Sequence, residues 1–290
     1  MTASPRGEVR VGTSGWHYPS GQGTWNGPFY PLKRPRGFDE LRFYAERFNT
    51  VEVNATFYRQ PEADMSRKWL DRTPESFLFS IKLFQKFTHP DMYLARPGAT
   101  DWDITSGDID LFRAGLDPIA SAGRLGALLM QFPSSFHATP DARAYVSWLL
   151  RAFADYPRAV EFRHRSWSEP GADTVARLDA AAATLVHIDE PFAEFTRATA
   201  RETTSPLVYM RLHGRNKAQW WEHAQAEDRY NYLYSESELQ PFANAAKADA
   251  ALEKRVLVYF NNHFSAKAVA NADILKRQLG EDAPGWQLRP

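Results

Sequence analysis

The amino-acid sequence predicts an α/β fold, a single (β/α)8 barrel over residues 1–290. Three observations predict it. Eight short apolar runs alternate with segments of helical periodicity, which favours parallel strands joined by right-handed crossovers. The segments after the first, third and seventh runs are long, and polar residues share one parity in most runs. Eight strand–helix units in a chain of this length fit a closed barrel better than the alternative, an open doubly wound sheet.

The eight runs are the predicted strands, because they are rich in the apolar residues that buried parallel strands carry. In chain order they are Glu8–Thr13, Thr50–Asn54, Phe77–Leu83, Ala127–Phe132, Arg158–Arg163, Ala183–Asp189, Leu207–His213 and Val256–Asn262. No repeat, low-complexity tract or proline-rich linker divides the chain, so a single domain is expected. After the first run, Gly12-Thr-Ser-Gly15 lacks the third glycine of a dinucleotide-binding fingerprint, which disfavours the open sheet.

Helical spacing is clear in several segments between the runs. Phe38–Phe48 repeats apolar residues at helical intervals, and Ser235–Glu238 and Ser265–Leu279 have the same character. At Thr139-Pro140-Asp141, a capping hydroxyl precedes a first-turn proline and an acid that faces the helix dipole. A helix is therefore predicted to begin there.

Loop lengths indicate which face of the barrel carries the function. Connections from helix into strand are short, such as Asp155–Pro157, whereas Ser14–Arg36, Phe84–Asp108 and Gly214–Tyr234 are long. Long irregular loops inside a compact domain are usually functional. In a barrel these three would gather at the carboxyl ends of the strands, where catalytic residues lie.

Side-chain alternation assigns the polar residues to the inside of the barrel. Successive side chains of a strand point in opposite directions, so the apolar parity suits the helix-covered surface and the polar parity points inward. In the sixth run this directs Val186 and Ile188 outward and His187 and Asp189 inward. The polar set, its neighbours at the strand ends and two loop tryptophans are the candidate site residues: Glu52, Asn54, Lys82, Gln131, Glu161, Arg163, His164, Asp189, Arg211, His213, Asn261, Asn262, Trp16 and Trp220.

Proton transfer is the role assigned to Glu161, Glu52 and His213. A carboxyl group at a partly desolvated strand end can have its pKa raised toward neutrality, and histidine already titrates there. Arg211 and Lys82 are expected to bind an anionic substrate. The remaining candidates are assigned to substrate binding.

A structural role is the alternative for the same residues. Buried carboxylates need partners. Glu161 would pair with Arg163 or Arg211, and Glu52 with Lys82 or Arg211, so that the ion pairs hold the barrel mouth together. The sequence leaves both roles open.

Composition constrains the partners. Lys and Arg number 35, and Asp and Glu also number 35, so the chain has no basic excess of the kind that coats DNA. Cysteine is absent, which excludes disulfides and thiolate metal sites. No apolar run resembles a secretion signal or a membrane span, so a cytoplasmic protein without a membrane partner is expected, of undetermined oligomeric state.

No cofactor is evident, and a divalent metal stays an open question. Glu52, Glu161, Asp189 and His213 are the residue types of a carboxylate-and-imidazole site, but they come from separate runs without a local ligand motif. The lysine and arginines of the same set would repel a cation.

Five segments resemble one known family. Similar motifs, in the same order and essentially end to end, occur in the YecE-like proteins, domain of unknown function family 72 (DUF72): Val11–Trp16, Phe48–Tyr58, Glu161–Trp167, Arg211–Gly214 and Phe260–Asn262. The resemblance implies a TIM-type barrel. It implies no reaction and carries over no catalytic residues, because the family has no settled activity.

The leading functional hypothesis is an enzyme, either a hydrolase, a lyase or an isomerase. It would act by acid–base chemistry on a small polar or anionic molecule, such as a phosphate ester or a sugar-like compound. A sugar hydrolase of the common barrel type fits poorly, because Gln131 and Arg211 stand where its carboxylates would be. The alternatives are a nucleic-acid-processing phosphodiesterase and a non-catalytic ligand-binding barrel.

Overall fold

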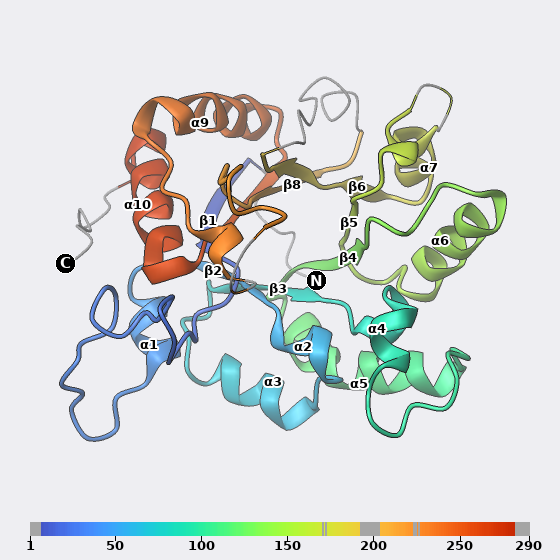
Figure 1. Ribbon diagram of the computed structural model, residues 1–290, viewed down its shortest axis with the longest axis horizontal. Coiled ribbons are helices and arrows are strands. Elements are labelled where there is room, and N and C mark those ends of the chain that lie inside the picture. Colours follow the sequence, from blue (N-terminus) through green and yellow to red (C-terminus); the bar gives the residue numbers. More distant parts are fainter. Residues whose placement is uncertain are drawn as a thin grey trace.

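Parallel strands form the centre of the molecule and helices surround them (Figure 1). The computed structural model describes residues 7–169, 171, 173–191, 204–222, 225 and 227–281. The strands are β1 (Val9–Thr13), β2 (Thr50–Val53), β3 (Leu78–Lys82), β4 (Leu125–Phe132), β5 (Arg158–Phe162), β6 (Ala183–Leu185), β7 (His187–Asp189), β8 (Leu207–Leu212) and β9 (Arg255–Phe260). Their order is β1-β9-β8-β7 in one sheet and β2-β3-β4-β5-β6 in the other, and the neighbouring strands pair in parallel.

The two sheets are joined at two places. Ser14, just after β1, forms a parallel bridge with Glu52 of β2, and the N–H of Gly15 donates to the carbonyl of Glu52 at 2.8 Å. On the other side only Val186 separates β6 from β7, and its N–H donates to the carbonyl of Val160 at 2.9 Å. β6 and β7 are therefore two halves of the predicted sixth strand, and the (β/α)8 fold class is confirmed.

The helices lie outside the strands, as crossovers between parallel strands require. They are α1 (Glu40–Ala45), α2 (Ala55–Tyr58), α3 (Ala63–Leu70), α4 (Pro90–Leu94), α5 (Ser106–Ser121), α6 (Pro140–Ala152), α7 (Thr174–Ala180), α9 (Glu236–Ala251) and α10 (Lys267–Leu279). Across the described ranges, no helix combines the length and the apolarity that crossing a bilayer requires.

Side-chain caps fix where helices begin. The hydroxyl of Thr139 accepts a hydrogen bond from the N–H of Ala142 at 3.2 Å, so α6 begins at the predicted place. Asp39 caps α1 in the same way, accepting from two backbone N–H groups. The predicted helix Phe38–Phe48 is therefore shorter than its apolar pattern, which continues into the turn before β2.

Apolar side chains fill both sides of the strands. One cluster lies between the strands and the helices. A second cluster, on the opposite parity, fills the inside of the barrel with Leu78, Ala127, Leu129, Ala159, Val186, Ile188, Leu207, Tyr209, Leu257 and Tyr259. The lower part of the barrel is therefore a packed core, and its charged residues lie toward the mouth.

The inward set predicted for the sixth strand is wrong. Val186 and Ile188 belong to the inner cluster, so alternation turns His187 and Asp189 to the other side of the strand. Inward-facing residues of this strand join the apolar core below the mouth. Polarity alone therefore does not distinguish the two faces of this strand.

Candidate active site

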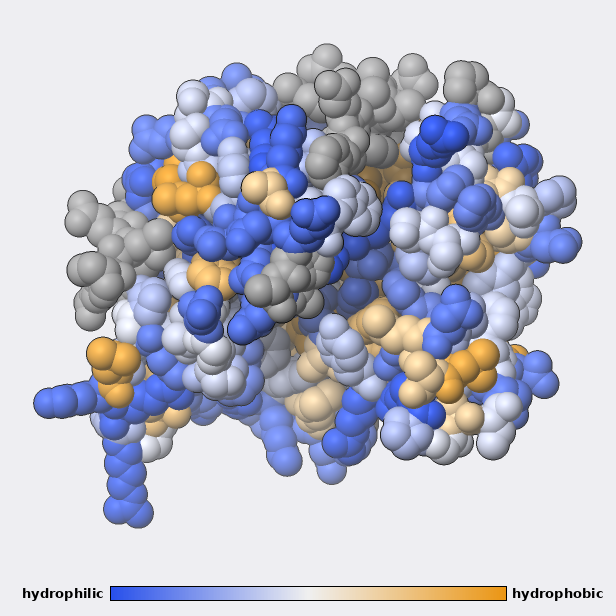
Figure 2. Space-filling model, in the orientation of Figure 1, coloured by the Kyte–Doolittle hydropathy of each residue, from blue (hydrophilic) through white to orange (hydrophobic). Residues whose placement is uncertain are grey.

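A cleft of about 1120 Å³ opens at the carboxyl ends of the strands. Figure 2 shows this side of the molecule, with a hollow near its centre where hydrophilic side chains lie below the rim. The volume is at the upper end of the range of small-molecule pockets. Of the predicted site residues, the cleft brings together Trp16, Asn54, Lys82, Gln131, Arg163, Arg211 and Asn261. The last six come from strand ends and are called the floor residues below.

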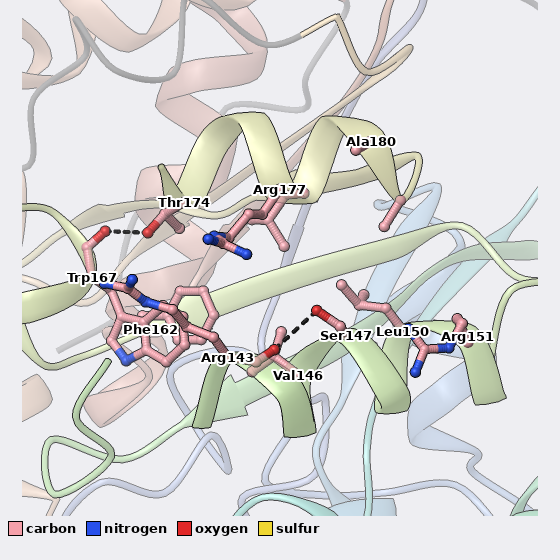
Figure 3. Close-up of a pocket in the computed structure, with 12 residues that line it drawn as sticks. Arg143, Val146, Ser147, Leu150, Arg151, Phe162, Trp167, Thr174, Arg177 and Ala180 are labelled. Atoms are coloured by element: carbon pink, nitrogen blue, oxygen red, sulfur yellow. Dashed lines mark hydrogen bonds between the residues drawn. The ribbon is translucent and has the colours of Figure 1, made fainter. Parts of the chain in front are cut away.

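A second, smaller pocket lies outside the barrel between α6 and α7 (Figure 3). Its volume is about 290 Å³, and Arg143, Arg151 and Arg177 are its charged residues. Arg143 and Arg177 extend into the space between the two helices. Among the described residues that line it there is no lysine, histidine or carboxylate, so these residues offer no group that exchanges protons near neutrality. The large cleft is therefore the candidate active site.

An ion network lies under and within the floor. Arg211 of β8 donates to the carboxylate of Glu52 from Nε at 2.9 Å and from Nη2 at 2.8 Å. Its Nη1 donates to Glu161 at 2.5 Å and to Gln131 at 3.3 Å. Arg163 donates from Nε to the other oxygen of Glu161 at 2.8 Å. Glu52, Glu161, Arg163 and Arg211 are the ion network, and both of its carboxylates are 0% exposed.

The network keeps Glu161 ionised. Burial opposes the charge, but Arg211 and Arg163 outweigh it and hold the pKa of Glu161 well below its ordinary value. The sequence suggested the opposite direction, a carboxyl with its pKa raised for proton transfer. The geometry matches the structural alternative: Glu161 and Glu52 do not line the cleft, and their charges are fixed by arginine.

His213 also lies beneath the floor. It is 0% exposed, and its Nδ1 lies 2.9 Å from the side-chain nitrogen of Asn261. Burial, reinforced by the charge of Arg211, lowers the pKa of His213 well below its ordinary value. The imidazole is therefore neutral at pH 7 and does not reach the cleft surface.

Lys82, at the end of β3, is the titrating group of the floor. Its Nζ lies 4.0 Å from the ring centroid of Phe57, and it forms no hydrogen bond or ion pair with a described residue. Burial, with the charges of Arg211 and Arg163, lowers the pKa of Lys82 to about 7. The amine therefore changes its protonation state near neutral pH.

Arg163 presents the other available cation. Its side chain is 23% exposed, and only its Nε is engaged, with Glu161, among the residues that the structure describes. Its two Nη atoms are free to donate toward the cleft, and a guanidinium suits a carboxylate or phosphate.

Aromatic side chains form the walls. Trp16 lies edge-on to Trp69 at 5.9 Å between ring centroids. Tyr18 stacks on His263 at 4.5 Å, and Tyr230 lies 4.9 Å from the same histidine. Of these rings only Trp16 is a predicted site residue, and it was chosen as a loop tryptophan. Alternation along the strands does not reach the others, because they come from loops and a helix.

Three arginines of the rim were also missed, Arg34, Arg72 and Arg229, and the first two are paired with carboxylates. Arg72 contacts Asp39 at 2.6 Å, and Arg34 contacts Glu40 at 2.7 Å. Arg34 and Arg72 are therefore neutralised, whereas Lys82 and the Nη atoms of Arg163 have no carboxylate partner among the described residues.

Glu190 is a further residue that the alternation missed. It follows β7 on the inward parity of Ile188, and its charge interacts with Arg163 and Glu161. Burial raises its pKa. The sequence had placed Asp189 there instead.

Four predicted site residues do not line the cleft and hold loops instead. Asp189 accepts from Arg215 at 2.8 and 2.9 Å and from Tyr234 at 2.6 Å. Asn262 donates to Tyr232 and to Asn271, each at 2.8 Å.

The other two are His164 and Trp220. His164 stacks on His137 at 3.7 Å. Trp220 is buried beside Tyr230, at 6.3 Å between ring centroids. Both residues therefore pack against other loop residues above the strands and stabilise the loops.

The three carboxylates considered as possible metal ligands are each paired with an arginine. Glu52 and Glu161 are neutralised by Arg211, and Asp189 by Arg215. In the part of the chain that the structure describes, no group of three or more His, Asp and Glu side chains could hold a metal ion. The donor set therefore does not fit a divalent cation.

Comparison with known proteins agrees with the fold and the motifs. The model of a family described as "Protein of unknown function DUF72" matches residues 10–290. The UPF0759 protein YunF of Bacillus subtilis is 30% identical over 289 residues, which are 97% of this chain and 98% of that protein.

Two solved structures are also similar. A DUF72 family protein from Thermotoga maritima is 33% identical, with a TM-score of 0.76 over 94% of this chain and 99% of that one. A DUF72 family protein from Enterococcus faecalis has a TM-score of 0.78 over 98% of both chains at 24% identity, a likeness of fold.

Proposed function

Because the chain belongs to the DUF72 family, whose function is unknown, we propose its activity from its own cleft: an enzyme that acts by acid–base chemistry on a small anionic, sugar-like substrate. The observation that supports the proposal is Lys82. Burial lowers the pKa of this amine to about 7, and it has no hydrogen-bond or ion-pair partner among the described residues, on a floor that also carries arginine.

The cations of the floor support an anionic substrate. Arg211 donates its hydrogen bonds to the carboxylates of the ion network, so it would attract a substrate by its charge rather than by hydrogen bonds. Arg163 has two Nη atoms left for a phosphate or carboxylate, and Lys82 adds a second cation when protonated. Phosphate is the better match, because its charge and oxygen count suit two adjacent donors.

The rest of the cleft suits a hydroxylated carbon skeleton. The amides of Asn54, Gln131 and Asn261 offer both donors and acceptors for hydroxyl groups. The ring of Trp16 offers an apolar face of the kind that stacks on sugars. A phosphorylated sugar combines both requirements.

Proton transfer is assigned to Lys82 in place of the glutamates. A general acid or base works best when its pKa is close to the working pH, and Lys82 meets this condition. Glu161 and Glu52 become positioning residues, since they hold Arg211, whose charge lowers the pKa of Lys82. The phosphodiesterase alternative gains no support from the described residues, since their donor set does not fit a metal.

Proton exchange on sugar phosphates tests the proposal. Wild type would be incubated in D2O with a panel of aldose and ketose phosphates and their unphosphorylated sugars, and deuterium incorporation at carbon followed by NMR. We expect exchange with at least one phosphorylated member, an affinity loss of about tenfold in Arg163→Gln, and retained binding without exchange in Lys82→Met. No binding across the panel, or equal exchange in Lys82→Met, would refute the proposal.

A further inference from the structure

Resting on that proposed function, we infer that Lys82 acts as a nucleophile and that the substrates are carbonyl compounds: the free Nζ on the cleft floor forms an imine with the aldehyde or ketone carbon of a bound sugar phosphate. This names both the substrate class and the covalent step of the site.

The first support is the position of Nζ. Lys82 comes from a strand end, so its backbone is rigid, and its Nζ packs over the ring of Phe57 at 4.0 Å. An amine held by a carboxylate would be a charged donor and no nucleophile. Lys86 is such a case, since its Nζ lies 3.0 Å from both carboxylate oxygens of Asp108.

The second support is the charge around the amine. Burial, and after it the charges of Arg211 and Arg163, disfavour a further cation on the floor and lower the pKa of Lys82 to about 7, so part of the amine is neutral at pH 7. The carboxylates that could restore the charge, Glu52 and Glu161, are occupied by the guanidinium groups. The same arginines attract the phosphate, which brings the carbonyl of the substrate to the amine.

The step balances with one proton from the solvent. The lone pair of Nζ attacks the carbonyl carbon, a C–N bond forms, and the π electrons move to the oxygen, which takes the proton that the nitrogen releases. The hydroxyl of this carbinolamine takes one proton from the solvent and leaves as water, while the nitrogen lone pair forms the C=N bond. The resulting protonated imine withdraws electrons from the adjacent carbon and acidifies its C–H bond. Amine, carbonyl and one proton thus become iminium and water, with nothing oxidised or reduced.

Reductive trapping is the test. Wild type would be mixed with one equivalent of glycolaldehyde phosphate, reduced with sodium borohydride, and mapped by peptide mass spectrometry. Hydride from the borohydride reduces the C=N bond to a stable secondary amine. We expect one dominant adduct at Lys82 and none above background at Lys86.

The pH dependence adds a second readout. Because only the neutral amine attacks, the rate of adduct formation should rise about tenfold between pH 6 and pH 8 and then level off. An adduct spread over surface lysines, with a rate still rising steeply above pH 9, would overturn the inference.

Matched variants separate this inference from the proposed function. Lys82→Arg keeps the cation and should lose the adduct, whereas Lys267→Arg should keep it. Lys267 is the matched control because burial also lowers its pKa, but its Nζ donates to Asn231. Folding of each variant would be checked by circular dichroism.

Binding of a sugar alcohol phosphate, which has no carbonyl, would be measured in parallel by calorimetry. If it binds and Lys82→Met abolishes deuterium exchange while wild type gives no adduct at Lys82, the imine is refuted and the proposed function stands. If the sugar alcohol phosphate does not bind, the proposed function fails.

Discussion

At the scale of single residues, the environment decides the chemistry of Lys82. Lys86 lies in the same segment, is also nearly buried, and forms an ion pair with Asp108 at 3.0 Å. Lys82 has no carboxylate partner, and burial, together with the charges of Arg211 and Arg163, lowers its pKa to about 7. The same residue type therefore supplies a structural cation in one position and a reactive amine in the other.

Burial of Lys82 makes folding stability depend on pH in a predictable direction. Its ordinary pKa is 10.5 and its folded value about 7, so between these values the unfolded chain binds more protons. The free energy of unfolding contributed by this residue is therefore lowest below pH 7 and rises toward pH 10. We expect the stability of wild type relative to Lys82→Met to increase over this window, measured by urea unfolding at each pH.

The difference in unfolding free energy between wild type and Lys82→Met reports on Lys82, because the other titrating groups contribute to the stability of both proteins. Below pH 6 the amine is charged in both the folded and the unfolded state, and the difference should be flat. A difference that stays constant from pH 6 to pH 10 would mean that Lys82 keeps its ordinary pKa.

The partners of Glu161 could be named from the sequence, but its role could not. Alternation places Glu161 and Arg211 inward, and the structure shows the two in contact at 2.5 Å. The sequence does not give the depth of Glu161 below the cleft floor. A strand residue one layer lower in the barrel is covered by its neighbours and cannot contact a ligand. Depth depends on how β2, β5 and β8 are staggered around the barrel, and no local pattern encodes that stagger.

At the scale of elements, Gly12 has a structural function rather than a role in nucleotide binding. A Cβ at this position of β1 would lie 2.3 Å from the carbonyl oxygen of Thr50 in β2. This is where the two sheets meet, next to the bridge between Ser14 and Glu52. Glycine lets the two backbones approach there.

Gly12→Ala should therefore weaken the junction of β1 and β2. The contact is with backbone, which cannot rotate away, so we expect a loss of about 1–3 kcal/mol in the free energy of unfolding. Gly107→Ala is the control, because a Cβ there meets nothing closer than 3.5 Å, and it should be neutral or slightly stabilising. Equal stabilities of the two variants in thermal unfolding would contradict this account.

In the sixth strand, polar and apolar alternation did not predict which side chains face inward. In β2, β3, β5 and β8 the polar parity carries Glu52, Lys82, Glu161 and Arg211, and these residues meet at the mouth. In β6 and β7, inward Val186 and Ile188 fill the core below the mouth. Asp189 was therefore assigned to the wrong face and Glu190 was overlooked, although both follow from a single choice of parity.

At the scale of the whole molecule, the fold was predictable because every unit repeats the same signal. Eight apolar runs, helices between them and long loops on one face leave few arrangements other than a barrel. The aromatic walls were not predictable in the same way. Tyr18, Trp69 and Tyr230 lie far apart in the sequence, and only the closure of the loops over the strands brings them to one cleft.

A ligand in the cleft would contact several strands and loops, so binding should stabilise the barrel as a unit. A single-site ligand at 100 times its Kd adds about 2.7 kcal/mol to the free energy of unfolding, roughly 5 °C or more in Tm for a domain of this size. We expect a sugar phosphate to produce this shift and the unphosphorylated sugar to produce less. Arg163→Gln should reduce the shift, because its free Nη atoms would hold the phosphate.

The outer pocket supplies the matched control. Arg143 lines it with a buried Nε that has no hydrogen-bond partner among the described residues, so it is a second arginine able to attract an anion. Arg143→Gln should leave the ligand-induced rise in Tm intact. If Arg143→Gln abolishes the ligand-induced rise in Tm and Arg163→Gln does not, the anion binds between α6 and α7. The cleft would then not be the substrate site.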